Sequence, residues 1–180
     1  LLNAVRNHPD AAYALTDDER FGLISGIMPI PLAGLTRPIP AGVPVTAGFV
    51  RGVPRLGLPD LLATDASLGV TNPFQLRVGD GATALPSGLA IAATFDPALA
   101  ERAGAMVARE ARARGFNILL GGGINLAFDP RNGRNFEYLS EDPHLSGVLG
   151  AAIVAGIQGR RVGASLKHFA VNNQEADRLR

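Results

Sequence analysis

Short apolar runs alternate with longer periodic segments through the last two thirds of the chain. The apolar runs that predict strands are 61–64, 89–93, 116–120 and 162–166. Asp96-Pro97 and Asp142-Pro143 each predict a helix start, because aspartate is a favourable N-cap and proline suits the first helical turn. These helices should run to Arg114 and to about Gln158. The alternation predicts right-handed strand–helix–strand units on a parallel sheet.

The N-terminal part has a different pattern. Thr16 and Glu19 have the spacing of a capping box, which predicts a short helix reaching about Ile27. Residues 28–59 contain seven prolines, which excludes regular helix and predicts a wrapping loop with short strand pieces. We therefore divide the chain into an N-terminal helix with a Pro/Gly-rich wrapping segment, 1–60, and a second part, 61–180. The second part is predicted as the first half of a (β/α)8 TIM-type barrel in an α/β fold.

Composition narrows the classes of function. The chain has 180 residues, 47% of them hydrophobic, and 17 basic against 16 acidic side chains. The resulting net charge of +1 gives no electrostatic reason to expect nucleic acid or an anionic membrane as partner. No apolar run approaches the roughly 18 residues of a membrane span. Cysteine is absent and the histidines, His8, His144 and His168, lack metal-ligand spacing, so no zinc site is predicted.

Both ends of the sequence suggest a fragment. It begins at Leu1 without an initiator methionine and stops at Arg180, five residues after Glu175. We expect upstream and downstream parts of the same chain to be missing. The absence of a signal peptide therefore says little about the compartment.

Two polar segments, 133–143 and 167–175, lie next to stretches predicted as buried, where polar groups are costly unless something binds them. Arg134 lies in the first, and Lys167 and His168 end the last predicted strand. Asp65 ends the first one. Because α/β enzymes place their sites at the carboxyl ends of parallel strands, we expect these four side chains to bind a ligand rich in hydroxyls or carrying negative charge.

Each of these side chains also has a structural interpretation that the sequence leaves open. Asp65 could be a turn or N-cap carboxylate, Arg134 could tie its loop to a nearby acid, and the cationic pair 167–168 could form a salt bridge. The acids concerned are Glu137 or Asp142 for Arg134, and Glu175 or Asp65 for the pair.

From about Leu58 to Glu175 the chain resembles glycoside hydrolase family 3, the family of many β-glucosidases and β-xylosidases. Several separate motifs carry the resemblance in the family's order. They are Ala63-Thr64-Asp65, Ala82-Thr83-Ala84-Leu85-Pro86, Ala92-Ala93-Thr94-Phe95-Asp96, Gly115-Phe116-Asn117-Ile118-Leu119-Leu120-Gly121, Asp129-Pro130-Arg131-Asn132-Gly133-Arg134-Asn135-Phe136-Glu137 and Lys167-His168-Phe169.

The resemblance implies a barrel domain in which Asp65, Arg134, Lys167 and His168 hold hydroxyls of the nonreducing-end sugar. It also implies retaining hydrolysis of β-linked glucosides or related sugars, with an oligosaccharide or β-glucoside as substrate and no cofactor. A secreted or periplasmic location is favoured over a cytoplasmic one. A catalytically inactive carbohydrate-binding or scaffold protein is the alternative. A lyase using Lys167 as a Schiff base is disfavoured, because the adjacent His168 makes the setting polar.

The chain departs from the family pattern in two places. The family usually continues its aspartate with Gly-Pro, whereas Asp65 is followed by Ala66 and Ser67, which predicts a different turn. Asn132 stands where a tryptophan commonly precedes Gly-Arg, which predicts a less aromatic pocket wall. The sequence after His168 also lacks the Pro-Gly-His of the β-N-acetylglucosaminidase branch, which favours the β-glucosidase-like branch.

A retaining glycosidase needs two carboxylates roughly 5 Å apart, a nucleophile and an acid/base. In family 3 the nucleophile lies in a later strand-end motif, commonly Ser-Asp-Trp. This chain has no tryptophan and no such motif. We therefore assign no catalytic residue to the chain, expect both carboxylates beyond residue 180, and predict that the 180 residues alone are inactive.

Overall fold

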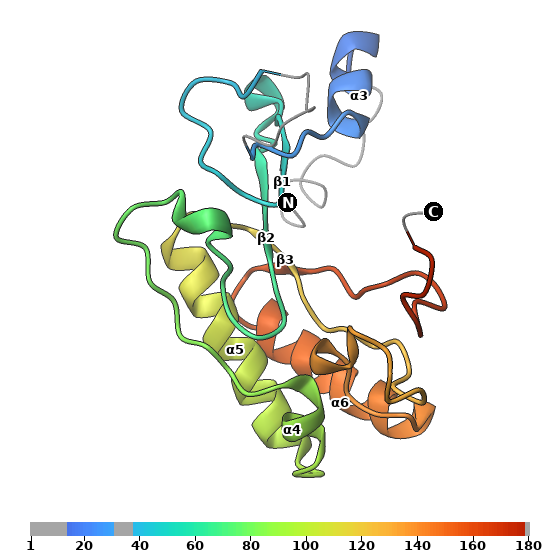
Figure 1. The fold of residues 1–180 in the computed structure, drawn as a ribbon. Helices are drawn as coiled ribbons and strands as arrows, with labels where there is room; N and C mark the ends of the chain where they lie inside the picture. Colours follow the sequence, from blue (N-terminus) through green and yellow to red (C-terminus); the bar gives the residue numbers. More distant parts are fainter. Residues whose placement is uncertain (1–13, 31–37, 179–180) are drawn as a thin grey trace. The chain divides into compact units, whose positions relative to one another are not determined.

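The computed structural model describes residues 14–30 and 38–178 (Figure 1). His8 and both ends of the chain, Leu1 and Arg180, lie outside the described residues. The chain divides into two compact units. The first comprises residues 1–63 and 72–78, and the second comprises residues 64–71 and 79–180.

The first unit contains the predicted N-terminal helix, α3 (Asp17–Ile24). The capping box is present, since the Thr16 hydroxyl accepts from Glu19 N at 3.3 Å and the Glu19 carboxylate accepts from Thr16 N at 2.8 Å. The helix ends three residues before the predicted Ile27. In the described part of 28–59 the regular elements are the short strand β1 (Gly48–Val50) and the 3-10 turn η1 (Pro54–Leu56), as the prolines lead one to expect.

Strand β2 (Leu61–Asp65) forms where the first apolar run predicts it. In the first unit it pairs antiparallel with β1, with Gly48 opposite Ala63. The 3-10 turn η2 (Pro73–Gln75) also belongs to this unit. Phe49, Val53 and Leu58 are its buried apolar side chains around the hairpin.

The second unit contains the predicted parallel strands. Strand β3 (Ile118–Leu120) pairs with β4 (Gly163–Ala164), and Ile118 lies opposite Gly163. Strand β2, whose last residues Thr64 and Asp65 belong to this unit, is the next neighbour of β3 in the strand order. A parallel bridge between Gly123 and Lys167 continues the pairing beyond the strands. Because helix α6 (Pro143–Gln158) connects β3 and β4, these elements form a complete strand–helix–strand unit.

The long helices begin at the predicted residues. Asp96 caps α5 (Pro97–Ala113), and its carboxylate accepts from Ala98 N at 2.8 Å and Leu99 N at 3.1 Å. Asp142 caps α6 in the same way, accepting from His144 N and Leu145 N at 3.0 and 3.2 Å. The expected helix starts are therefore confirmed.

The prediction of a strand at 89–93 is wrong, because this run forms helix α4 (Gly88–Ala92). The Ser87 hydroxyl caps the helix by accepting from Ala90 N at 3.1 Å. The run is rich in alanine and leucine, which favour helix, and is too short for periodicity to distinguish the two structures. Ile91 and Ala92 are buried, whereas Leu89 is exposed.

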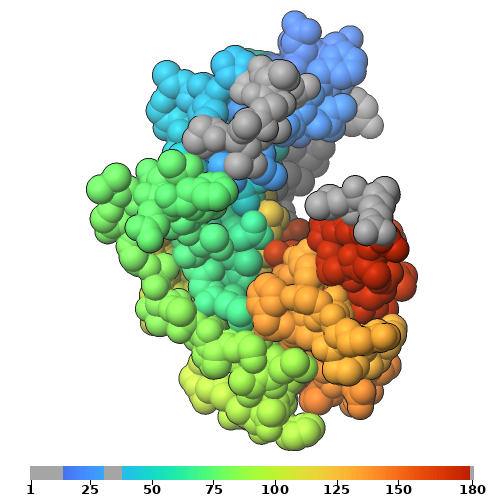
Figure 2. Space-filling view, in the orientation of Figure 1, coloured from blue at the N-terminus to red at the C-terminus, as the bar shows by residue number. Residues whose placement is uncertain are grey.

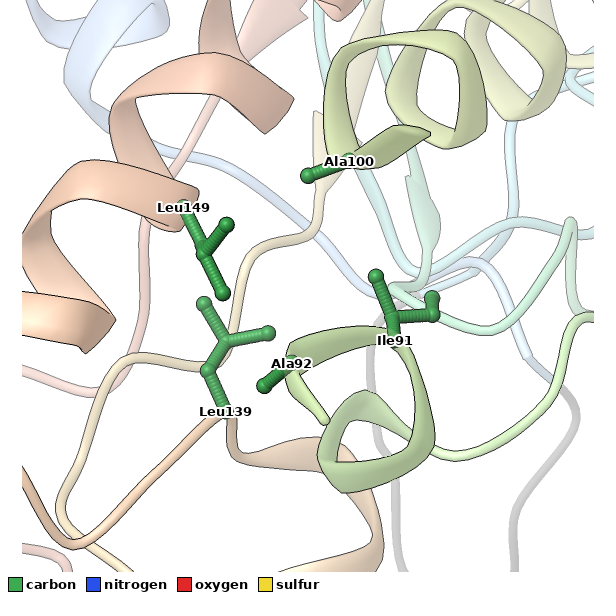
Figure 3. Close-up of a cluster of buried hydrophobic side chains, with 5 residues drawn as sticks. All are labelled: Ile91, Ala92, Ala100, Leu139 and Leu149. Atoms are coloured by element: carbon green, nitrogen blue, oxygen red, sulfur yellow. The ribbon is translucent and has the colours of Figure 1, made fainter. Parts of the chain in front are cut away.

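The core of the second unit lies between these helices. Figure 3 shows its central apolar cluster, formed by Ile91, Ala92, Ala100, Leu139 and Leu149. Helices α5 and α6 lie side by side (Figure 1). Their backbones approach closely where Gly156 faces the backbone of Glu101.

Candidate functional site

The structure brings together the four residues that the sequence singles out. Asp65 ends β2, Arg134 precedes the 3-10 turn η3 (Asn135–Glu137), and Lys167 and His168 follow β4. Lys167 Nζ donates to Asp65 Oδ1 at 3.0 Å, and Arg134 Nη2 lies 2.7 Å from His168 Nε2. Three distant segments of the second unit therefore supply one group of side chains.

Glu137 joins the two pairs. Its side chain is 6% exposed, it accepts from the guanidinium of Arg134, and its Oε2 lies 3.5 Å from Lys167 Nζ. We call Asp65, Arg134, Glu137, Lys167 and His168 the polar cluster. The ion pairs that the sequence left open for Arg134 and Lys167 are therefore formed. Arg134 pairs with Glu137, and Lys167 pairs with Asp65.

The formal charges of the polar cluster balance. Two carboxylates face one guanidinium and one ammonium, and burial together with nearby Arg134 lowers the pKa of His168, which favours the neutral imidazole. An anionic ligand would find no excess of positive charge there. A neutral ligand rich in hydroxyls could exchange donors and acceptors with the cluster without changing its charge.

The hydrogen bonds of His168 define its tautomer. A guanidinium can only donate, so Nε2 accepts from Arg134 and the ring proton is on Nδ1. Nδ1 lies 3.3 Å from the Tyr138 hydroxyl. That hydroxyl donates to Asn172 O and accepts from Asn172 Nδ2, both at 2.8 Å. Burial raises the pKa of Tyr138, which keeps this phenol protonated.

Amide side chains hold the backbone around the cluster. Asn125 Oδ1 accepts from His168 N at 2.8 Å, and Asn173 Oδ1 accepts from Leu126 N at 3.1 Å. Glu175 lies 3.7 Å from Arg134 and accepts from Arg178, whose hydrogen bond lowers the pKa of Glu175. Figure 2 shows the orange segment and the red C-terminal segment side by side on one face.

Sequence reasoning missed several of these supporting residues. Glu137, Tyr138 and Asn172 lie inside the two polar segments, so their position was a signal, but they were not assigned to the site. Asn125 gave no signal in the sequence. Its role depends on a contact 43 positions along the chain.

A pocket of about 280 Å³ adjoins the polar cluster at Glu137. Its walls are the turn 66–71, the segment 82–84, Phe136 and Glu137. Most of these side chains are apolar, with hydroxyls at three positions. The pocket and the cluster together offer apolar surface next to hydrogen-bonding groups, which suits the mixed surface of a sugar ring.

Among the described residues, no three His, Asp or Glu side chains converge as a metal site would require. In the same residues, none of the helices has the length and apolar character to cross a membrane.

Asp65 and Glu137 both contact Lys167 and act as hydrogen-bond acceptors. The absence of a catalytic carboxylate from this chain stays a prediction.

Fold and site together define an α/β domain with a cluster of paired polar side chains at the carboxyl ends of its strands. The sequence pattern described as "Glycosyl hydrolase family 3 N terminal domain" matches residues 47–178. The chain belongs to glycosyl hydrolase family 3. The N-terminal domain of this family is a TIM-barrel-like α/β fold, so the predicted family and fold class are confirmed.

Individual relatives agree with this assignment. The chain is 44% identical over 135 residues to thermostable beta-glucosidase B of Acetivibrio thermocellus, covering 72% of this chain and 18% of that protein. It is 38% identical over 141 residues to an exo-alpha-(1->6)-L-arabinopyranosidase of Bifidobacterium longum, covering 74% and 19%. Beta-glucosidase 3B from Thermotoga neapolitana, solved in complex with glucose, superposes with a TM-score of 0.81 at 35% identity, covering 94% and 24%. The chain thus spans less than a fifth of these two curated relatives.

Proposed function

We propose that the whole gene product is a glycoside hydrolase acting on β-linked glucosides or related sugars, and that this chain supplies contacts to the sugar. Family membership and the beta-glucosidases among its relatives support the reaction class. The observation that carries the proposal is the convergence of Asp65, Arg134, Lys167 and His168 in one charge-balanced network.

Each residue has a role that its hydrogen bonds suggest. Lys167 and Arg134 donate to sugar oxygens, while Asp65 accepts from sugar hydroxyls. His168 Nε2 accepts from a hydroxyl when the sugar displaces Arg134 from it. These contacts strengthen as the sugar ring flattens toward the transition state, so they contribute to rate as well as to affinity.

The catalytic carboxylates of a retaining mechanism are proposed to lie outside this chain. Asp65 and Glu137 are each in contact with Lys167, which suits acceptors of hydrogen bonds more than a nucleophile or an acid. We expect no turnover of an aryl β-glucoside by the purified 180-residue chain, together with turnover by the whole gene product. Detectable hydrolysis by the purified short chain would overturn this assignment.

A matched pair of arginines in one loop tests the sugar-binding role. Arg134→Ala in the whole product should lower kcat/KM for an aryl β-glucoside on the order of 10²-fold, a typical loss for a transition-state hydrogen bond. Arg131→Ala is the control, because the Arg131 side chain is 88% exposed and pairs with Asp129. It should leave kcat/KM within about twofold. Equal losses in both variants would contradict the proposal.

The second candidate is a catalytically inactive carbohydrate-binding protein. Its support is that the polar cluster supplies donors and acceptors for hydroxyls, whereas no catalytic carboxylate is assigned to this chain. Calorimetric titration with glucose, together with an assay of β-glucoside hydrolysis, distinguishes the hydrolase from the inactive binding protein. Glucose binding without hydrolysis of any β-glucoside by the whole gene product would favour the inactive protein, whereas turnover would exclude it.

A further inference from the structure

The turn that follows β2 holds Asp65 at its start. Within it, Ala66 N donates to Gly69 O at 3.0 Å, and Thr71 N donates to Asp65 O at 2.7 Å. On one side of the turn, Leu85 N donates to Leu68 O at 2.8 Å. That side is held by a backbone–backbone bond, which does not depend on the identity of a side chain.

On the other side of the turn, the Ser67 side chain makes a contact with the segment that follows β3. The Ser67 hydroxyl oxygen accepts from Gly122 N at 3.0 Å and from Gly123 N at 3.3 Å. These glycines follow β3, 55 and 56 positions along the chain. Ser67 lies in the stretch where the chain departs from the Gly-Pro of its family, so a hydroxyl is available here.

The same glycine segment also holds Lys167. Lys167 N donates to Gly122 O at 3.3 Å, and Ile124 N donates to Lys167 O at 2.9 Å. At Gly123 a side chain would collide with the backbone carbonyl of Glu137, so this segment also lies against the polar cluster. One short segment therefore positions the backbone of Lys167 and, through Ser67, the turn that carries Asp65.

These contacts form a closed ring. It runs from Asp65 through the turn to Ser67, across to 122–124, on to Lys167, and back through the bond between Lys167 Nζ and Asp65 Oδ1 at 3.0 Å. We propose that Ser67 is a positioning residue that sets the Asp65 carboxylate relative to Lys167. Its effect on sugar binding rests on the function proposed above, whereas its effect on the Asp65–Lys167 pair does not.

The test is a double-mutant cycle in the whole gene product, with Ser67→Ala, Asp65→Ala and the double variant. Ser67→Ala should weaken glucose binding, measured by calorimetry, by about tenfold, since small displacements of a positioning group have effects of this order or larger. In the Asp65→Ala background the same change should have an effect of less than about twofold, because the residue that it positions is gone. Equal effects in both backgrounds would overturn the proposal.

Two further variants separate positioning from a general loss of stability. Ser67→Thr keeps the hydroxyl and should stay within about twofold of the wild type, whereas Ser67→Cys keeps a similar shape with a weaker acceptor and should lose affinity. Ser87→Ala is the matched control, because the Ser87 hydroxyl also accepts a backbone N–H but at the start of α4. It should lower the melting temperature without changing glucose affinity. Loss of affinity in Ser87→Ala equal to that in Ser67→Ala would contradict a specific role.

The same double-mutant cycle can be measured without a ligand, as changes in the free energy of unfolding in urea. The changes at Ser67 and Asp65 should be non-additive in the free energy of unfolding, because the two residues share one turn and one ring of contacts. If the wild type binds no glucose and hydrolyses no β-glucoside, the function proposed above fails. Non-additive unfolding would then still support the positioning role, and additive unfolding would overturn it.

Discussion

Arg134 Nη2 lies 2.7 Å from Nε2 of His168, so the arginine cation is hydrogen-bonded to an imidazole. The imidazole would itself be positively charged if it were protonated. The contact requires the imidazole to be neutral, because a guanidinium has no acceptor and a protonated ring has no free lone pair. Tyr138 completes the arrangement on the other side of the ring. Protonation of His168 would therefore break the Arg134 contact and place two positive charges together.

This relationship predicts an acid-sensitive fold. Burial, followed by the charge of Arg134, lowers the pKa of His168 below its ordinary value of 6.5. The unfolded chain then binds a proton more readily than the folded one, so stability falls as pH decreases through 6.5 toward the folded pKa. The melting temperature should decline between about pH 7 and pH 5 in the wild type, and less steeply in His168→Gln. Parallel curves for the two proteins would contradict this assignment.

The ion pair between Arg134 and Glu137 leads to a second prediction, which concerns the free energy of unfolding. Arg134→Met leaves the Glu137 carboxylate, 6% exposed, without its closest cation. The free energy of unfolding in urea should fall by about 3 kcal/mol, as expected when one partner of a buried pair is removed. The double variant Arg134→Met, Glu137→Leu should recover part of that loss, because it no longer contains the buried carboxylate that lost its closest cation.

Arg131→Met provides the comparison for that experiment. Its exposed side chain lies in the same loop, so the change should stay within about 0.5 kcal/mol. A double variant less stable than Arg134→Met alone would show that Glu137 is held by its other neighbours, chiefly Lys167, and would refute the expected recovery.

Much of the site follows from one rule that can be applied to a sequence. Residues that end parallel strands meet at one edge of the sheet, and this brings Asp65 and Lys167 within 3.0 Å across 102 positions. The helix starts at Asp96 and Asp142 could also be predicted from the sequence, because an N-cap followed by proline is a local signal.

The remainder depends on contacts that no local pattern contains. Glu137 was considered only as a clamp for Arg134, and its second contact with Lys167 requires the folded arrangement. Asn125 supports His168 from a loop without a distinctive motif. The error at α4 has a similar origin, since five apolar residues fit a strand and a helix equally well and the Ser87 cap decides between them.

The contact between α5 and α6 predicts a third result, on two glycines of one helix. A side chain at Gly156 would collide with the backbone of Glu101, so Gly156→Ala must push the helices apart. It should lower the free energy of unfolding by about 1–3 kcal/mol, as overpacking typically does. At Gly147, also in α6, an added methyl group meets nothing within 4 Å. Gly147→Ala should therefore raise stability by about 0.5–1 kcal/mol through helix propensity. Urea unfolding of both variants measures the contrast, and a loss of similar size at the two positions would mean that backbone flexibility matters here more than the close approach of the helices.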